Sequence, residues 1–200
     1  NALKENTSGE RNIGIGNACL DANTTGDDNI GIGTNTMGAN TTGVQNVAVG
    51  SYALDANTTG SYNNAFGYQA LTTNTTGQEN AAFGNMAVKL NTTGSYDTGV
   101  GSYALYENTT GSNNTAVGYQ SLEKNTTAND NTALGYRALK ANTTGAYNVG
   151  IGVSALAANT TASYNTAIGR ESLTTNTTGA TNTAVGTGSL KLNTTGSENV

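Results

Sequence analysis

Apolar residues fall in fixed columns of a seventeen-residue unit that repeats along the whole chain. Counted from the leading Asn of each unit, place ten is always Ile, Val, Phe or Leu, and place nine is always Gly or Ala. Place fifteen is Leu in every copy except two, which carry Met37 and Val88. A fixed period of this length, without insertions, indicates a stack of similar structural units.

The columns around places nine and fifteen predict two short strands in each unit. Side chains alternate between the two faces of a strand, so places eight and ten share one face and place nine lies on the other. We take places ten and fifteen as the two buried columns and expect another backbone to approach the small residue at place nine. Place eleven is Gly in every copy, from Gly16 to Gly186, which predicts a positive φ or a close backbone approach.

The predicted fold is therefore all-β, a parallel β-solenoid with one coil per seventeen-residue unit. Residues 1–200 form about twelve coils without caps at either end, as in an excerpt of a longer chain or a subunit that stacks end to end. Coils about 4.8 Å apart make a rod of roughly 55 Å. Because the apolar columns of one chain are thin, we expect a homotrimer around the fibre axis, with the strand of places eight to ten buried and the Asn-Thr-Thr-Gly turn outward.

Place seven is Asn in every copy but one, in which Asp97 replaces it. Aligned Asn side chains in a parallel stack hydrogen-bond to the copies above and below, so this column predicts a structural ladder. The predicted ladder consists of Asn12, Asn29, Asn46, Asn63, Asn80, Asn114, Asn131, Asn148, Asn165, Asn182 and Asn199.

The leading Asn of each unit also begins an Asn-x-Thr or Asn-x-Ser triplet, the acceptor sequence for N-glycosylation. The candidate glycosylation sites are Asn6, Asn23, Asn40, Asn57, Asn74, Asn91, Asn108, Asn125, Asn142, Asn159, Asn176 and Asn193, and Asn113 adds one more triplet. Asn, Thr and Gly also favour turns, so turn formation alone explains the same residues. Both interpretations stay open, as does a sugar coat on the adjacent Thr hydroxyls.

Composition narrows the range of functions. Low hydrophobicity is compatible with disorder, but the fixed apolar columns argue against it. A net charge of -5 without basic clusters argues against nucleic acid as a partner. The sequence has no run of about twenty apolar residues, so we expect no membrane span in this segment. With no His and one Cys, the chain lacks a Ser-His or Cys-His pair, so we expect neither an enzyme nor a cofactor.

Three further sequence features are candidate sites. Cys19 occupies a column of small residues and is expected to be buried, or to meet its copies in a trimer. Asp27 and Asp28 lack the Gly-rich calcium repeat, so no metal site is expected. Columns of Thr at places two and three raise the alternative of an ice-binding surface, although neighbouring Thr residues in a strand would face opposite sides.

These columns resemble the YadA-like head repeats of trimeric autotransporter adhesins, through segments 46–50 (Asn-Val-Ala-Val-Gly) and 165–169 (Asn-Thr-Ala-Ile-Gly). Segments 118–122 (Gly-Tyr-Gln-Ser-Leu) and 67–71 (Gly-Tyr-Gln-Ala-Leu) are similar to repeats in phage tail-fibre and bacterial surface proteins. The resemblance implies a left-handed parallel β-roll, three chains per fibre and a role in attachment.

The expected function is a non-enzymatic structural or adhesive fibre, the shaft or head of a surface adhesin or tail fibre. It would be extracellular, on a cell or virion surface, with further copies of itself as partners and a host surface or glycans as ligands. The alternative is a self-assembling extracellular filament or matrix protein with a glycan coat. An ice-binding solenoid is the remaining hypothesis.

Overall fold

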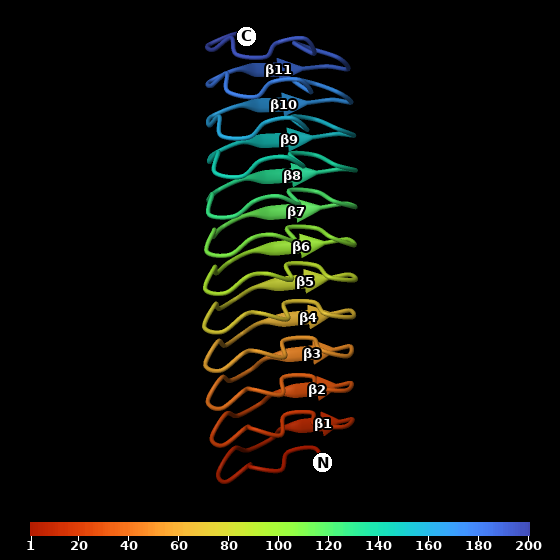
Figure 1. Ribbon diagram of the computed structural model, residues 1–200, viewed down its shortest axis with the longest axis vertical. Helices are drawn as coiled ribbons and strands as arrows, with labels where there is room; N and C mark the ends of the chain where they lie inside the picture. Colours follow the sequence, from red (N-terminus) through yellow and green to blue (C-terminus); the bar gives the residue numbers. More distant parts are fainter.

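The computed structural model describes residues 1–200 as one straight stack of coils, with the two termini at opposite ends (Figure 1). Each coil contributes one strand of three residues to a single eleven-stranded sheet. The strands are β1 (Ile13–Ile15), β2 (Ile30–Ile32), β3 (Val47–Val49), β4 (Asn64–Phe66), β5 (Ala81–Phe83), β6 (Thr98–Val100), β7 (Thr115–Val117), β8 (Thr132–Leu134), β9 (Val149–Ile151), β10 (Thr166–Ile168) and β11 (Thr183–Val185).

All neighbouring strands pair in parallel and follow chain order from β1 to β11. The register aligns equivalent places of successive coils, as in the pairing of Ala116 in β7 with Ala133 in β8. Parallel strands need a long connection, and here that connection is the rest of the same coil. The prediction of a parallel β-solenoid with one coil per repeat is confirmed. The structure contains no long apolar helix of the kind that crosses a membrane.

Each coil contains one strand and not the two that the apolar columns predict. The segment around place fifteen leaves the β region because non-glycine residues at places thirteen and fifteen have positive φ, for example Tyr52 at 61° and Leu54 at 53°. Its amides still bond to the next coil, as in the 3.0 Å bond from Leu54 N to Ala70 O. The predicted second strand is therefore a tight turn that carries the buried Leu column.

Place nine, and not place ten, points into the coil. Ala116 in the middle of β7 is fully buried, whereas Val117 at place ten lies half-buried on the outer face. The prediction that place ten is a buried column is wrong for the single chain, and its burial against further copies stays a prediction. Alternation puts one face of the strand inside, and the column on that face consists of the small residues.

The chain itself, and not an approaching second backbone, restricts place nine to Gly and Ala. The large residue at place fifteen packs against it: a Cβ added to Gly99 would lie 2.5 Å from Cγ2 of Val88. The place-fifteen side chains from Leu20 to Leu173 are fully buried and share one hydrophobic core with the place-nine Ala residues. The core is therefore a narrow column of Leu stacked beside a column of Ala or Gly.

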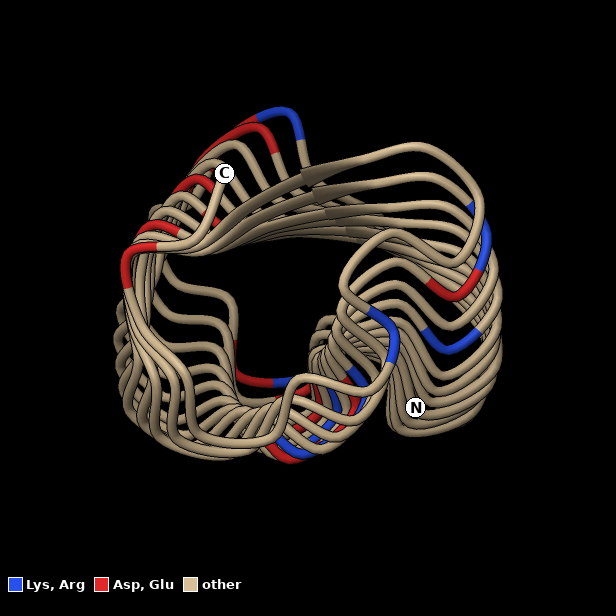
Figure 2. Cartoon of the chain, turned by 90° about the horizontal axis from the view of Figure 1, so that it is seen from above, with Lys and Arg blue, Asp and Glu red and all other residues tan.

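Viewed along the rod, the sheet forms one side of the coil and its strands carry no charged residue, whereas acidic and basic residues lie on the turns (Figure 2). Place eleven ends each strand with a Gly whose φ lies far in the positive range, 128° at Gly152. A Cβ on Gly152 would lie 2.7 Å from both the carbonyl carbon and the oxygen of Gly169 in the next coil. Both a positive φ and a close approach therefore require Gly here.

We predict that Gly152→Val destabilises the rod by about 2–3 kcal/mol, because the new side chain meets the next coil and strains a positive φ. Gly150→Ala is the matched control, because Ala occupies place nine in other coils and the added Cβ would meet only Leu139 and the carbonyl oxygen of Ala155 at 3.1 Å or more. Thermal denaturation followed by circular dichroism measures both. Equal melting temperatures for Gly152→Val and the parent chain would contradict the close approach.

Candidate functional site: two asparagine ladders and an apolar sheet face

The place-seven Asn side chains form a continuous column inside the rod. The Nδ2 of Asn148 donates to Oδ1 of Asn131 at 3.2 Å and to the carbonyl oxygen of Ala162 at 2.8 Å. Its Oδ1 accepts the backbone amide of Asn165 at 3.0 Å. Equivalent bonds recur from coil to coil. The Asn side chain directly before each strand therefore links its own coil to the coils on both sides. Asn148 and its equivalents are fully buried in the middle of the rod.

The leading Asn residues, which the sequence predicts as turn residues or glycosylation acceptors, form a second ladder. The Nδ2 of Asn74 donates to Oδ1 of Asn57 in the previous coil at 2.9 Å and to the carbonyl oxygen of Gly77 at 3.0 Å. The first bond joins two coils, and the second closes the Asn-Thr-Thr-Gly turn. The signal for this ladder was already present, because Asn occupies place one in all twelve copies.

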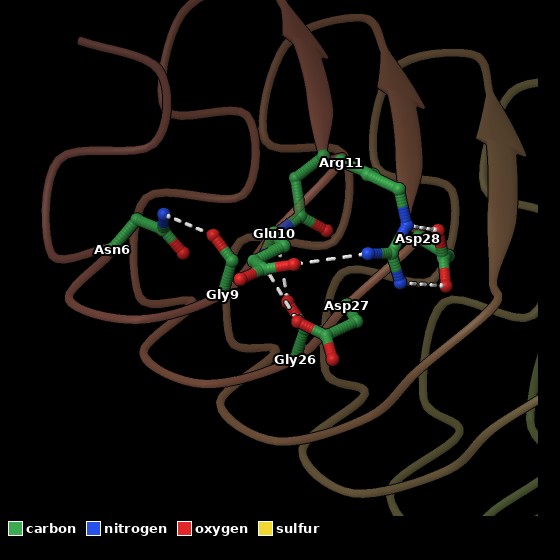
Figure 3. A network of polar contacts seen from close by, with 8 residues as sticks. Asn6, Gly9, Glu10, Arg11, Gly26, Asp27 and Asp28 are labelled. Atoms are coloured by element: carbon green, nitrogen blue, oxygen red, sulfur yellow. Dashed lines mark hydrogen bonds and ion pairs between the residues drawn. The ribbon is translucent and has the colours of Figure 1, made fainter.

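The candidate glycosylation sites from Asn23 to Asn176 are all fully buried in the folded rod. Both hydrogens of each Nδ2 are donated, to the previous Asn and to the turn carbonyl, for example at Asn91. A glycan on this nitrogen would replace one of those bonds inside the rod, so the fold offers no free acceptor there. Asn6 is exposed, but its Nδ2 donates to the carbonyl oxygen of Gly9 across the turn at 2.9 Å, as Figure 3 shows. The additional triplet at Asn113 lies on the exposed surface.

The two Thr residues of the turn behave differently. The place-two hydroxyl donates to the backbone carbonyl of the equivalent Thr in the next coil, for example from Thr92 to Thr109 at 2.9 Å. The place-three side chain, such as that of Thr93, is exposed and makes no hydrogen bond to the protein. An ice-binding face would need a flat double row of free Thr hydroxyls. The rod has only a single column of them.

Charged residues at the first coils lie on the surface and pair with one another. Arg11 holds Asp28 in the next coil through two guanidinium nitrogens and also contacts Glu10 (Figure 3). This pairing lowers the pKa of Asp28. Asp28 is thus part of a surface ion-pair network, and Asp27 accepts the backbone amide of Glu10. No three acidic, Cys or His side chains in the chain are placed to hold a metal ion. Cys19 is buried in the core, and burial raises the pKa of its thiol.

The outer face of the sheet carries large apolar side chains along the whole rod. Places eight and ten of β1 to β11 hold Ile, Val, Leu, Phe, Ala, Thr or Asn, and no charged residue. Several are well exposed, with Ile32 and Ile168 each 38% exposed and Phe83 40% exposed. Phe66 and Phe83 stack with ring centroids 4.9 Å apart, close to the spacing of adjacent strands. We call this surface the outward face.

Exposed Tyr residues flank the outward face at places six and twelve. Tyr147 and Tyr164 stack at place six with ring centroids 5.1 Å apart, and Tyr119 and Tyr136 stack at place twelve at 5.8 Å. Such rings are large amphipathic surfaces suited to contact with another macromolecule. Because each pair comes from successive coils, the rings lie in rows along the rod.

Asp97 is the only acidic residue among the place-seven residues of the ladder. Its carboxylate is fully buried and accepts hydrogen bonds from Asn114 N at 2.9 Å, Asn114 Nδ2 at 3.1 Å and Asn108 Nδ2 at 3.0 Å. Burial raises the pKa of Asp97 to about 7, because desolvation of the charge outweighs these three bonds. In the sequence, Asp97 is simply the one substitute for Asn in its column, and its titration follows only from its burial.

Comparison with models of protein families, with curated proteins and with solved structures found no match. The candidate surfaces are therefore interpreted from their geometry. The structure contains no pocket. The candidate features are the two buried Asn ladders and the outer surfaces of the rod.

We predict that Asn148→Ala lowers the free energy of unfolding by about 2–3 kcal/mol, because buried groups of the two neighbouring coils lose their partners. Asn85→Ala is the control, since Asn85 is exposed and its side chain makes no hydrogen bond to the protein. Chemical denaturation of both variants gives the comparison. A loss of the same size in both variants would contradict a structural role for the ladder.

We also predict that Asp97 makes the stability of the rod depend on pH. Its folded pKa of about 7 lies above the ordinary value of 3.8, so the folded chain binds the proton more tightly than the unfolded chain. The resulting stability is complete below pH about 4 and is lost as the pH rises through about 7, by up to about 4 kcal/mol. Asp97→Asn restores the residue of the other coils and should be more stable than the parent chain at pH 8.

Melting temperatures of the parent chain and Asp97→Asn at pH 4 to 8 test this expectation. The exposed carboxylates are common to both chains, so their contributions cancel in the difference. Parallel pH profiles for the two chains would show that Asp97 does not titrate in this range.

Proposed function

We propose that this chain is a non-enzymatic structural segment of an extracellular fibre, the shaft or head of a surface adhesin or tail fibre. The observation that carries the proposal is the outward face, an uncharged strip that has a large apolar residue at place ten of all eleven strands of a straight rod. The chain does not need this strip for its own core, which lies on the inner face of the sheet. An exposed apolar strip of this extent is typical of an interaction surface.

The size of the outward face suits an association between chains. Eleven strands about 4.8 Å apart, each with three residues at about 3.3 Å, give a flat area of roughly 500 Å² on each chain. Three such faces around a common axis bury about 1,500 Å² in total, which is about 500 Å² for each chain and is in the range of specific interfaces. The flanking Tyr rows would extend the contact beyond the strands.

Further copies of this chain are the partner that fits best. Apolar side chains on the outward face recur once per coil, so a partner must have the same axial spacing to interdigitate along the whole length. A second copy has that spacing by construction, and the lack of charge at places eight and ten removes repulsion between identical faces. We propose a trimer around a common fibre axis, in which the outward faces meet and the Asn-Thr-Thr-Gly turns face the surroundings.

The fibre would act as a rigid rod and would present the same turn residues at every coil. Each coil adds the same bonds to its neighbours, so the stability of the rod grows with the number of coils. The exposed turns repeat the same chemistry at every coil, which gives a fibre with a periodic surface for contact with a host surface or glycans.

Self-association is tested with the double variant Ile32→Asp/Ile168→Asp, which places charges on the outward face. We expect the parent chain to sediment as a trimer and the variant to sediment as a monomer, with the circular dichroism spectrum unchanged because both side chains point outward. Gln78→Asp, an exposed charge at place five, is the control and should remain trimeric. A parent chain that stays monomeric at high concentration would overturn the proposal.

Cryo-electron microscopy of the native fibre distinguishes an attachment fibre from a structural filament. Three rods in cross-section with a distinct tip would support an attachment fibre. A continuous filament without a tip would instead favour a structural matrix.

A further inference from the structure

A hydroxyl group occupies place three in all twelve copies of the repeat. We call these residues the turn hydroxyls: Ser8, Thr25, Thr42, Thr59, Thr76, Thr93, Thr110, Thr127, Thr144, Thr161, Thr178 and Thr195. Every one of them is exposed. They lie in one column along the rod, because the coils stack in register with equivalent places aligned.

The folded rod does not use the turn hydroxyls. None of their side-chain oxygens donates or accepts a hydrogen bond. In every coil that has a following coil, the place-two Thr directly before them donates to that coil, as Thr143 does to Thr160 at 3.0 Å. The turn itself is closed by other groups, for example by Asn142 Nδ2 and the carbonyl oxygen of Gly145 at 2.8 Å. The structure therefore explains place one, place two and the small residue at place four, but not the hydroxyl at place three.

Two neighbouring places of the same turn, whose side chains are exposed or half-buried, vary from coil to coil. Place five holds Val44, Gln78 and Ala146 in different coils, and place six holds Tyr62 and Asp130 among others. Place three keeps a hydroxyl throughout, and its one departure, Ser8, loses the methyl group and retains the hydroxyl. Twelve copies within one chain thus retain a functional group that has no partner inside the fold. The glycosylation triplet also contains this hydroxyl, but its Asn is buried and hydrogen-bonded within the rod, for example at Asn142, which leaves a partner for the hydroxyl itself outside the chain.

We propose that the turn hydroxyls are the acceptors for O-glycosylation of this rod, with a nucleotide-activated sugar as the donor. Each hydroxyl belongs to a turn that is clamped by the Asn at place one and the small residue at place four. Figure 3 shows this clamp between Asn6 and Gly9. An enzyme can reach this position without opening the coil. The neighbouring place-one Asn amides from Asn23 to Asn176, by contrast, are buried, and both hydrogens of each Nδ2 are donated, as at Asn142.

The transfer needs no group from the rod other than the hydroxyl. The Oγ1 of Thr attacks the anomeric carbon of the activated sugar and forms the new carbon–oxygen bond. The bond from that carbon to the phosphate oxygen breaks, and the nucleoside diphosphate leaves with the bonding electrons. A base of the transferase takes the hydroxyl proton, so no oxidant or reductant is required.

Charge and spacing favour a sugar over a phosphate on this column. Adjacent turn hydroxyls lie about 4.8 Å apart, the spacing of the coils. Phosphates would bring roughly -1.5 to -2 charges each to this spacing, on a chain whose net charge is already -5. Neutral monosaccharides avoid this repulsion. Their bulk at about 4.8 Å favours short chains or occupation of only some coils.

The proposal concerns the exposed turns and does not depend on self-association through the outward face. A chain that proves monomeric can still carry the sugars, and a trimer can lack them. The sugar column would give the rod a hydrated, neutral edge opposite in character to its apolar face.

Peptide mass spectrometry of the protein isolated from its native producer tests the assignment. Cleavage after Lys89 and Lys124 releases residues 90–124, and cleavage after Lys140 and Arg170 releases residues 141–170. Fragmentation that preserves O-linked groups should place hexose-type mass increments on Thr93, Thr110, Thr144 or Thr161. The place-two residues Thr92, Thr109, Thr143 and Thr160 in the same peptides should be unmodified and serve as internal controls. Unmodified peptides, or increments on place-two Thr or on Asn, would overturn the proposal.

A pair of variants tests the premise that the fold does not need these hydroxyls. Thr93→Val should melt at the same temperature as the unglycosylated parent chain, because its hydroxyl has no partner. Thr92→Val should melt about 2–4 °C lower, because it loses the bond to the carbonyl of Thr109. A loss in Thr93→Val as large as that in Thr92→Val would show that place three is kept for stability and would remove the basis of the proposal.

Discussion

The structure depends on one constraint: each coil must find its hydrogen-bond partners in the coils directly above and below. The chain makes 128 backbone hydrogen bonds, of which only 20 lie within the strands. Most bonds between coils are therefore made by turns and not by the sheet. Buried turn groups would be costly without partners, and the two Asn ladders supply partners at the places where the backbone alone cannot.

This constraint explains why the repeat keeps its length. An inserted residue would shift every later place relative to the coil below, so that Asn, Gly and Leu no longer met their equivalents. The positive φ values at places six, thirteen and fifteen close the coil within seventeen residues. The cost of these conformations is offset only because each coil is held by two neighbours, which is how strained backbone persists in folded proteins.

The narrow core leaves the rod with two unlike exposed surfaces. Leu and Ala fill the interior of the coil, so the large residues at place ten remain on the outward face. The turn hydroxyls, by contrast, present polar groups that have no partner within the rod. The proposed fibre, with one face for association and one polar edge for contact with its surroundings, would account for both. Asp97 is a local exception, in which one coil of the ladder acquires a titratable group.

The period, the parallel stacking and the requirement for Gly at place eleven were determined by the sequence alone, because identical places recurring every seventeen residues must meet in any stack. The sequence could not decide which face of a three-residue strand lies inside. Place ten is the larger and more apolar column, yet the Leu at place fifteen fills the interior and leaves room only for Gly or Ala beside it, as Gly99 against Val88 shows.

The leading Asn gave an equally ambiguous signal, since a turn, a glycosylation acceptor and a ladder all require the same residue. Only the tertiary structure separated them, because burial and the donation of both amide hydrogens depend on the coil below, for example at Asn57. The same holds for the two Thr residues that follow. Their sequences are alike in every unit, but the fold turns one hydroxyl toward a neighbouring carbonyl and the other toward solvent, because adjacent side chains in a tight turn point in different directions.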